Sequence, residues 1–249
     1  LRYFKQYTPQ FIRRAKTIAT VSAFSKADMI QQYKTPPEKI TVVYNGVKPV
    51  FQAISFEEQA AVKEKYTGGA EFFLCTGALQ PRKNLINLLK AFSIFKRRMQ
   101  SEMKLVLAGR LAWKNDEFLT LLKTYKYKDE VVLTGYLEDG ELARLTASAY
   151  AAVYPSLFEG FGVPVLEAMQ CGVPALTSRD SSMEEISAGA ALYFDPFNVD
   201  DIAYKLMFIY KNEGERKELM ESGKAVAAGY TWERTAGLLW DCLLKVAGS

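Results

Sequence analysis

The sequence predicts an α/β fold in which a doubly wound parallel sheet carries helices on both faces. From position 71 onward, short apolar segments alternate with helices of about 10–15 residues, a pattern typical of parallel sheets. The segments 71–76, "EFFLCT", and 103–108, "MKLVLA", are continuous apolar runs, which indicates strands buried on both faces. With 249 residues, the chain is long enough for one large domain, or for one domain and part of a second.

The individual elements follow from the spacing of apolar residues and from the positions of proline and glycine. Ahead of the alternation we expect a helix over 2–15, a strand over 17–22, a helix over 25–32 that ends before Pro36, a strand over 40–45, and a loop through Gly46 and Pro49. The alternation predicts strands over 71–76, 103–108, 131–134, 151–154, 174–177 and 190–194. It predicts helices over 84–99, 115–126, 138–148, 164–170, 183–187, 198–211, 213–227 and 232–246. No element is predicted between Pro49 and position 71.

Composition narrows the classes of function. The chain is 49% hydrophobic and 24% charged with a net charge of +4, which suits a small anionic ligand or a membrane surface and is too weak for nucleic acid. It has no histidine, so neither a Ser-His-Asp nor a Cys-His nucleophile can be built. It also lacks Cys-x-x-Cys, His-Glu-x-x-His, a Walker lysine loop, Gly-x-Ser-x-Gly and a full Gly-x-Gly-x-x-Gly.

The cysteines and the hydropathy pattern bear on location. Cys75, Cys171 and Cys242 are odd in number and lie in apolar stretches, so we expect buried thiols in a reducing compartment. A membrane-spanning helix needs about 18 consecutive apolar residues, and no apolar run is that long. No signal peptide is recognisable. We therefore expect a cytoplasmic protein, with the inner face of the membrane as an open alternative.

The first candidate loop is "GALQPRKN", 77–84. In doubly wound sheets, ligands bind beyond the carboxyl ends of the strands, so the places to search are the loops after Thr76, Ala108, Thr134 and Tyr154. Asn84 is a good helix N-cap, so Arg82 and Lys83 lie just ahead of the amino end of a helix. The helix dipole is positive there, so each cation lowers the stability of the fold by about 0.3–1 kcal/mol unless an anion lies between them. Two interpretations stay open. The two cations are solvated and point away from the helix end, or they form a phosphate site in which Arg82 donates two hydrogen bonds and Lys83 contributes a positive charge.

The second candidate loop lies in "LFEGFGVPVLEAMQCGVPAL", 157–176. Pro164 suits the first position of a helix, and Gly172 suits the position just past its end. The amides of three residues would then point out of the helix start without partners: Phe161, Gly162 and Val163. Glycine at 160 and 162 lets the backbone come close to a ligand, so this segment predicts an anion cradle.

Two glutamates flank this cradle. Glu167 falls one turn into the helix, where the dipole favours an acid, so a purely structural role stays open for it. Glu159 lies upstream on the loop, where it can accept hydrogen bonds from the hydroxyls of a sugar. A carboxylate repels an anion, so the ligand must carry phosphate in one part and hydroxyls in another. A nucleotide-sugar fits, with diphosphate at the amides and at Arg82 and Lys83, ribose at one glutamate and hexose at the other.

At this point the residues resemble a known family. "PSLFEGFGVPVLEAMQCGVPALTS" is similar to the E-x7-E signature of retaining glycosyltransferases of family 4, also called group 1. In order and spacing, the same family is matched by "TVSAFSKADMI", "ITVVYNGV", "TGALQPRKN", "LVLAGRLAW", "VVLTGYLEDGELARL" and "AALYFDPFNVDDIA". The resemblance covers nearly the whole chain and implies the GT-B architecture, in which two Rossmann-like domains face each other across a cleft.

The resemblance also implies roles for residues. It assigns the donor diphosphate to Gly77, Arg82, Lys83, Phe161, Gly162 and Val163. It assigns the ribose to Glu167, the catalytic position at the hexose to Glu159, and the base to the backbone of Tyr136 and Leu137. The donor would be a GDP- or UDP-linked sugar, with no metal and no other cofactor. The resemblance implies that the hexose would be transferred with retention and that the departing phosphate would take the acceptor's proton, so that no protein base would be needed.

The resemblance divides the chain as well. Residues 1–45 are expected to be a remnant of the amino-terminal acceptor domain with its linker, 46–230 the nucleotide-sugar-binding domain and 231–249 a carboxyl-terminal helix. We therefore expect a fragment that is inactive alone, taken from an enzyme of polysaccharide or lipopolysaccharide assembly. Its partners would be the donor and a glycan or lipid-linked acceptor, with no nucleic acid and with peripheral membrane association left open.

Two positions depart from the family pattern. Ala78 stands where many relatives have arginine, and Ser181-Ser182-Met183-Glu184-Glu185 stands where relatives often read Ser-Ser-x-Pro-Glu. Two other functions remain as alternatives: a non-catalytic nucleotide-sugar-binding module, and a sugar-nucleotide epimerase of the same architecture.

Overall fold

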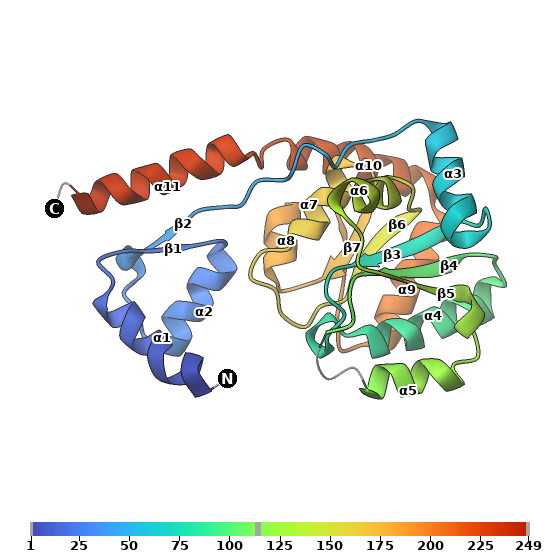
Figure 1. The fold of residues 1–249 in the computed structure, drawn as a ribbon, viewed down its shortest axis with the longest axis horizontal. Helices are drawn as coiled ribbons and strands as arrows, with labels where there is room; N and C mark the ends of the chain where they lie inside the picture. Colours follow the sequence, from blue (N-terminus) through green and yellow to red (C-terminus); the bar gives the residue numbers. More distant parts are fainter. Residues whose placement is uncertain (1, 113–115, 248–249) are drawn as a thin grey trace.

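The protein has two lobes, each built on a parallel sheet (Figure 1). A computed structural model describes residues 2–112 and 116–247. Within these ranges the smaller sheet has two strands and the larger has six. The strands are β1 (Ile18–Thr20), β2 (Ile40–Val42), β3 (Phe72–Thr76), β4 (Lys104–Ala108), β5 (Val131–Gly135), β6 (Ala151–Tyr154), β7 (Ala175–Ser178) and β8 (Leu192–Phe194). Every predicted strand is present, and each pairs in parallel with its neighbours.

Helices cover both faces of the larger sheet, as the sequence predicts (Figure 1). One face carries α4 (Leu85–Met99), α5 (Asp116–Thr124) and α9 (Val199–Lys211). The other carries α3 (Phe56–Thr67), α6 (Asp139–Ala147), α7 (Val163–Gln170) and α8 (Ser182–Ser187), with α10 (Glu213–Ala227) packed on α7. Because both faces are covered, all the residues of β3, β6 and β7 are buried. The fold class is thereby confirmed; the start of the predicted helix 115–126 lies outside the described residues.

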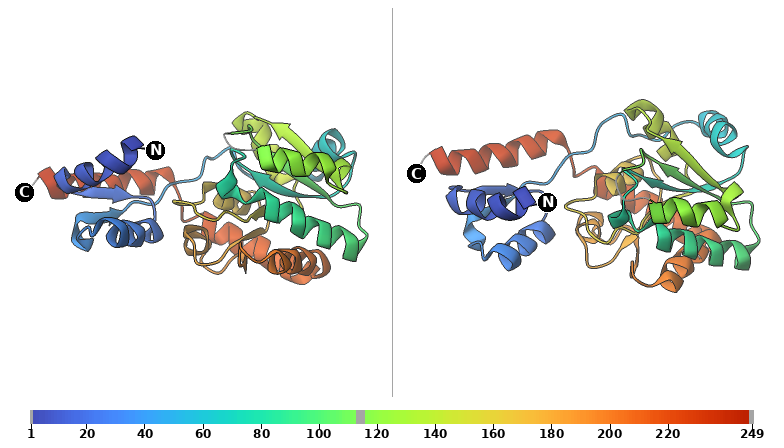
Figure 2. Two further views of the ribbon diagram at one scale, coloured as in Figure 1. Left: turned by 90° about the horizontal axis from the view of Figure 1, so that it is seen from below. Right: turned by 60° about the horizontal axis from the view of Figure 1, so that its bottom comes forward.

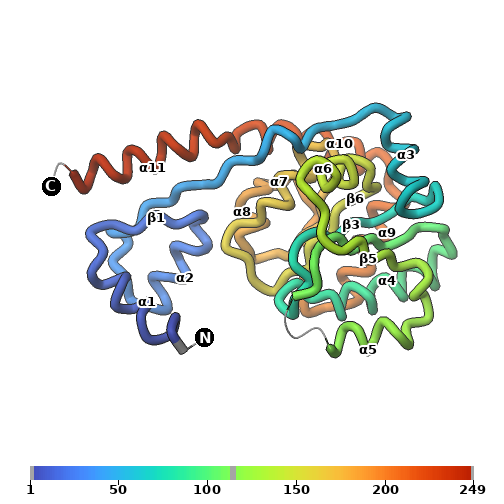
Figure 3. The backbone as a smooth tube through the Cα atoms, viewed as in Figure 1, coloured from blue at the N-terminus to red at the C-terminus, as the bar shows by residue number. Residues whose placement is uncertain are grey.

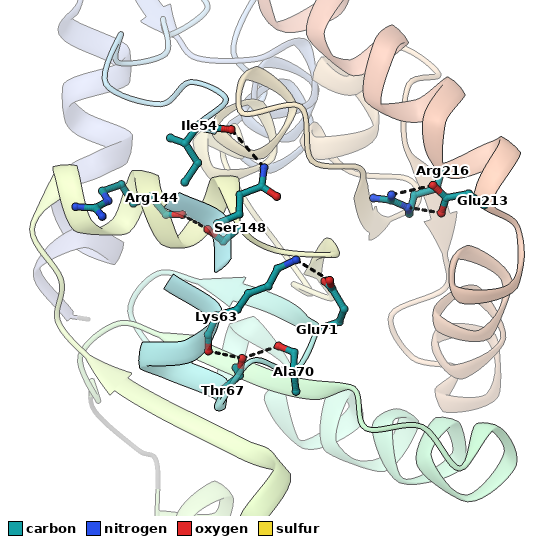
Figure 4. A network of polar contacts seen from close by, with 10 residues as sticks. Ile54, Lys63, Thr67, Ala70, Glu71, Arg144, Ser148, Glu213 and Arg216 are labelled. Carbon is teal, nitrogen blue, oxygen red and sulfur yellow. Dashed lines mark hydrogen bonds and ion pairs between the residues drawn. The ribbon is translucent and has the colours of Figure 1, made fainter. Parts of the chain in front are cut away.

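Helix α3 is an element that the sequence analysis missed. Only Val62 and Thr67 of this helix are buried, so its apolar spacing is weak. Its signal is a capping box, in which the Ser55 hydroxyl accepts from the Glu58 amide while the Glu58 carboxylate accepts from the Ser55 amide. The end of α3 is tied to the start of β3 by local polar contacts (Figure 4). Lys63 pairs with Glu71 at 2.6 Å, and the Thr67 hydroxyl donates to the carbonyls of Lys63 and Ala70.

The order of the strands creates a switch point. The larger sheet runs β5-β4-β3-β6-β7-β8, so the chain moves outward from β3 in one direction and from β6 in the other. The loops that leave these two central strands therefore separate to opposite faces, and ligands bind in the crevice between such loops. The Thr76 and Tyr154 hydroxyls lie 3.2 Å apart at the carboxyl ends of the two strands and join them directly. The candidate loops 77–84 and 155–163 both begin here.

The smaller lobe joins the larger one through two crossings of the chain (Figures 2 and 3). It contains α1 (Arg2–Arg14) and α2 (Ala23–Tyr33), and α11 (Trp232–Ala247) returns from the larger lobe to lie along it. At the crossings, the Val47 amide donates to the Tyr230 carbonyl at 3.0 Å, and the Thr235 hydroxyl donates to the Tyr44 carbonyl at 2.7 Å. Near the other end of α11, the buried Cys242 sulfur lies 3.8 Å from the Thr17 hydroxyl.

The cysteines match their expected environment, since all three are free and buried. In the part of the chain that the structure describes, no helix combines the length and the apolar character that crossing a membrane requires.

Gly46 allows the two crossings to touch, which makes it a test of the lobe junction. A Cβ atom at this position would lie 2.4 Å from the Trp232 nitrogen and 2.6 Å from the Thr231 carbonyl carbon. Both are backbone atoms, so Gly46→Ala forces the crossings apart and should destabilise the protein by about 1–3 kcal/mol in urea unfolding.

The matched control is Gly237→Ala in α11, where a new Cβ meets no atom within 4 Å. Alanine is the better helix former, so this variant should be more stable by about 0.5–1 kcal/mol. A Gly46→Ala protein as stable as wild type would show that the crossings are not in tight contact in solution.

Candidate functional site

The two loops that leave β3 and β6 are bound to each other across the switch point. The Leu157 amide donates to the Arg82 carbonyl at 2.8 Å, and the Arg82 guanidinium donates to the Phe158 carbonyl at 3.0 Å. The first loop contains a short 3₁₀ helix, Pro81–Lys83, which turns both cations toward the second loop. The sequence-predicted Arg82, Lys83 and Glu159 are thereby brought together.

The Glu159 carboxylate lies between the two cations. One oxygen pairs with the Arg82 guanidinium, and the other lies 2.9 Å from the Lys83 ammonium. The side chains of Glu159 and Lys83 are only 12% and 8% exposed, whereas that of Arg82 is 44% exposed. Burial by itself would raise the pKa of Glu159, but Lys83 and Arg82 outweigh it and hold that pKa below its usual value.

This arrangement tests one of the two interpretations of the basic pair, that of solvated cations. Lys83 is buried, so the interpretation as a solvated cation that swings away is wrong for it. The anion that two adjacent cations require is present in the protein itself, as Glu159. An incoming phosphate would therefore meet a site whose cations already share one carboxylate.

Two glycines make room for the Lys83 side chain. Gly77 has a φ of +112°, and a Cβ atom there would lie 3.2 Å from the Lys83 ammonium nitrogen. Gly109, at the end of β4, has a φ of +148°, and its Cβ atom would lie 2.1 Å from the Gly77 carbonyl oxygen. A side chain at position 77 would crowd the end of the Lys83 side chain, and one at position 109 would displace the backbone of the loop at Gly77.

The prediction for Asn84 is only partly right. Asn84 does occupy the N-cap position of α4, but its φ is +57° and its side chain makes no capping hydrogen bond. Its amide group instead donates to the Pro196 carbonyl at 2.7 Å, and Asn87 donates to the same oxygen at 3.1 Å. The Asn84 side chain thus binds the loop after β8 and does not cap α4.

The anion cradle forms at the start of α7. Gly162 is the N-cap, with a φ of +111°, and α7 begins at Val163, one residue earlier than predicted. Gly172, just beyond its end, has a φ of +72°, which agrees with its expected role. Among the described residues, no protein acceptor takes a hydrogen bond from the amides of Phe161, Gly162 or Val163. These donors are therefore available to an anion.

Glu167 lies in a different environment from Glu159. It is on α7, half-buried, and burial raises its pKa from 4.5 to about 7. Lys48 and Lys83 oppose this rise and the Asp139 carboxylate adds to it, so Glu167 lies within electrostatic reach of Lys83. A carboxyl group held in this way suggests a functional site, because its ionised form is destabilised in the protein without a ligand.

A pocket of about 190 Å³ lies over the ends of β4 and β5. Its lining brings together the sequence-predicted Gly77, Tyr136 and Leu137. Arg110 also lines it, with its guanidinium 5.9 Å from the centre of the Tyr136 ring. Arg110 was not among the predicted site residues, although its position two residues after the end of β4, at the same edge of the sheet, was a signal for it.

Serine side chains fix the backbone of the Glu159 loop, and the sequence analysis did not select them either. Ser22 and Ser25 donate to the Gly160 carbonyl at 2.6 and 2.9 Å, and Ser182 donates to the Glu159 carbonyl at 2.7 Å. Ser22 and Ser25 belong to the smaller lobe, so the site contains residues from both lobes.

The raised pKa of Glu167 predicts how stability depends on pH. In the unfolded chain Glu167 releases its proton near its usual value of 4.5, whereas in the folded protein it keeps the proton until about pH 7. The folded state binds more protons between these values, so this group lowers stability as pH rises from about 4.5 to about 7. Glu167→Gln removes that charge. It should stabilise the ligand-free protein by up to about 3 kcal/mol at pH 8 and have little effect near pH 4.

The measurement is urea unfolding of wild type and Glu167→Gln across this pH range. Exposed Glu218 on α10 provides the control, Glu218→Gln, which should differ little in stability from wild type because it changes only a surface side chain. A Glu167→Gln curve parallel to that of wild type would mean that Glu167 has an ordinary pKa.

Comparison with known proteins agrees with this geometry. A family model described as glycosyl transferases group 1 matches residues 56–226, which is over half of the chain, and a second described as glycosyltransferase family 4 matches residues 1–51. Both candidate loops lie within the first match.

Known relatives and solved structures extend the likeness to nearly the whole chain. The chain is 31% identical over 234 residues to the O-antigen chain mannosyltransferase B of Escherichia coli, covering 94% of this chain and 61% of the relative. It is 31% identical over 194 residues to the O-antigen chain mannosyltransferase RfbU of Salmonella typhimurium, covering 78% and 51%. The structure of Anabaena HepE in complex with UDP-glucose superposes with a TM-score of 0.84 at 17% identity, covering 100% of this chain and 69% of HepE.

These matches also show the extent of the chain. It spans between half and two thirds of the length of the two curated relatives. Its motifs, its switch-point site and its match to the family model agree, and the chain belongs to the glycosyl transferases of group 1.

Proposed function

We propose that this chain is the donor-binding region of a retaining hexosyltransferase that uses a nucleotide-diphosphate sugar. The observation that carries the proposal is the meeting of Arg82, Lys83 and Glu159 at the switch point, beside the free amides at the start of α7. Two cations and a row of amides suit a diphosphate, and a carboxylate suits sugar hydroxyls. Glu167 would hold the ribose, and the pocket at Tyr136 and Leu137 would take the base.

The charge arrangement suits departure of a diphosphate. As the glycosidic bond breaks, negative charge develops on the leaving phosphate, where Arg82, Lys83 and the amides of Phe161, Gly162 and Val163 would stabilise it. Glu159 is a poor general base because the two cations lower its pKa. We therefore propose that the leaving phosphate takes the acceptor's proton, while Glu159 orients the hexose and stabilises its developing positive charge. This proposal requires no metal ion and is consistent with a chain that has no histidine.

The relatives suggest the transferred sugar and the acceptor. Two of them are mannosyltransferases of O-antigen chains, so we propose a mannosyl donor and a glycan or lipid-linked acceptor of the lipopolysaccharide type. The HepE structure holds UDP-glucose, so both GDP- and UDP-linked sugars are tested below. The acceptor would be held mainly by residues beyond this chain, at the cytoplasmic face of a membrane.

Nucleotide binding tests the donor-site proposal directly. We expect calorimetry to show that the chain binds GDP or UDP with a micromolar to millimolar dissociation constant, about 4–8 kcal/mol. Arg82→Ala should weaken that binding by about 1.5–3 kcal/mol, because it removes a charge-assisted contact.

Arg179→Ala is the matched control. Arg179 follows β7 and is about as exposed as Arg82, but it pairs with Asp201 of α9. It should bind like wild type. Absence of binding to either diphosphate at millimolar concentration would contradict the proposal, as would equal effects of the two arginine variants.

Glu159→Gln should have opposite effects on the two kinds of ligand. It frees Arg82 and Lys83 from a competing carboxylate, so the bare diphosphate should bind about fivefold more tightly, which corresponds to about 1 kcal/mol. Wild type should bind GDP-mannose or UDP-glucose more tightly than the corresponding diphosphate, because Glu159 contacts the hexose. In Glu159→Gln this difference in affinity should be lost. Calorimetry with both ligands measures the two changes. Equal changes for both ligands would show that Glu159 does not face the sugar.

A further inference from the structure

The backbone of the Glu159 loop is held by side chains on two helices outside it. Ser22 and Ser25, at the start of α2, both donate to the Gly160 carbonyl. Ser182, at the start of α8, donates to the Glu159 carbonyl. Two consecutive peptide groups of the loop are thus fixed by three hydroxyl groups.

The direction of these bonds bears on the anion cradle. In a trans peptide group the carbonyl and the following amide point in opposite directions. Because Ser22 and Ser25 hold the Gly160 carbonyl toward α2, the Phe161 amide of the same peptide group points away from α2. It is one of the amides without a protein acceptor in the described ranges. The serines therefore set the direction of a donor in the proposed phosphate site.

Helix α2 is itself held in place by α8. The Glu185 carboxylate accepts from the Ala23 amide through one oxygen and from the Phe24 amide through the other, both at 2.8 Å. The Tyr44 hydroxyl also donates to it at 2.9 Å. Glu185 therefore satisfies free amides at the amino end of α2, where the helix dipole favours a negative charge. It belongs to the larger lobe, whereas α2 belongs to the smaller one.

We propose that Ser25, Ser182 and Glu185 are positioning residues for donor binding. Ser182 would fix the Glu159 loop directly. Glu185 would fix α2, so that its serines can fix the Gly160 carbonyl and aim the Phe161 amide at the phosphate. The seating of the smaller lobe and the binding of the donor would then be coupled, and each would strengthen the other. This inference rests on the proposed donor-binding function.

The variants are chosen so that each removes one link. Ser25→Ala and Ser182→Ala each delete one hydroxyl. Glu185→Gln keeps the size of the side chain but has one acceptor oxygen, so one backbone amide of α2 faces an NH₂ group instead.

The matched control is the neighbouring Glu184→Gln. Glu184 uses a single oxygen to accept from the Asp180 amide within its own lobe, and glutamine can replace it there. Ser25→Thr is the conservative variant, because it keeps a hydroxyl at the same position.

We expect Ser25→Ala, Ser182→Ala and Glu185→Gln to weaken calorimetric binding of GDP or UDP by about three- to tenfold, the factor that one hydrogen bond is worth. Glu184→Gln and Ser25→Thr should bind like wild type. In the ligand-free protein, the nuclear magnetic resonance order parameter of the Phe161 amide should fall in the three weakened variants and not in the other two.

The outcomes are distinguishable. If the three variants lower the melting temperature but bind the diphosphate like wild type, the residues are merely structural and the positioning role is overturned. An unchanged Phe161 order parameter in Ser25→Ala would also overturn it. If wild type binds neither GDP nor UDP, the donor-binding function falls, and the positioning role falls with it.

Discussion

The ion pairs of Glu159 with Arg82 and Lys83 are the contacts on which the candidate site depends. A lysine as buried as Lys83 needs a nearby anion, because an unpaired charge away from water is strongly disfavoured. The switch point between β3 and β6 brings the two loops close enough for Glu159 to supply one. The glycines at 77 and 109 serve the same contact, since each removes a side chain that would collide with Lys83 or with the loop that carries it. The candidate site is thus held together by contacts among the protein's own residues.

The pKa values of the two glutamates of the second loop and α7 are shifted in opposite directions. The neighbouring cations lower the pKa of Glu159, whereas burial raises that of Glu167 to about 7. Two acids whose environments separate their pKa values in this way are suited to different tasks. Glu159 is a fixed negative charge near the expected sugar. Glu167 is a destabilised acid whose ionised form would be favoured by hydrogen bonds from ligand hydroxyls, and the protein without a ligand is less stable because of it.

The site also depends on contacts between the lobes. The backbone of the Glu159 loop is hydrogen-bonded to α2, and α2 is capped by Glu185 of α8. Gly46 brings the two chain crossings into contact, so the lobes are joined both at the crossings and at the site. A change in the angle between the lobes would therefore reach the Gly160 peptide group directly. This path is short and consists of hydrogen bonds between named groups, so a movement of the smaller lobe would be transmitted to the loop that carries Glu159.

The sequence by itself determined the fold class and most of the element boundaries, because buried parallel strands and amphipathic helices leave periodic patterns of apolar residues. It also determined which loops form the site, since strand ends in this fold lie at one edge of the sheet. It missed α3, whose signal is polar and local rather than periodic. It placed Glu159 at the site and did not show that its carboxylate pairs with Arg82 and Lys83, some 76 residues away in the chain. The roles of Ser22, Ser25, Ser182 and Glu185 were likewise decided only by the tertiary structure. Hydrogen bonds and ion pairs between distant segments depend on strand order and on the packing of lobes, and neither leaves a repeating pattern in the sequence.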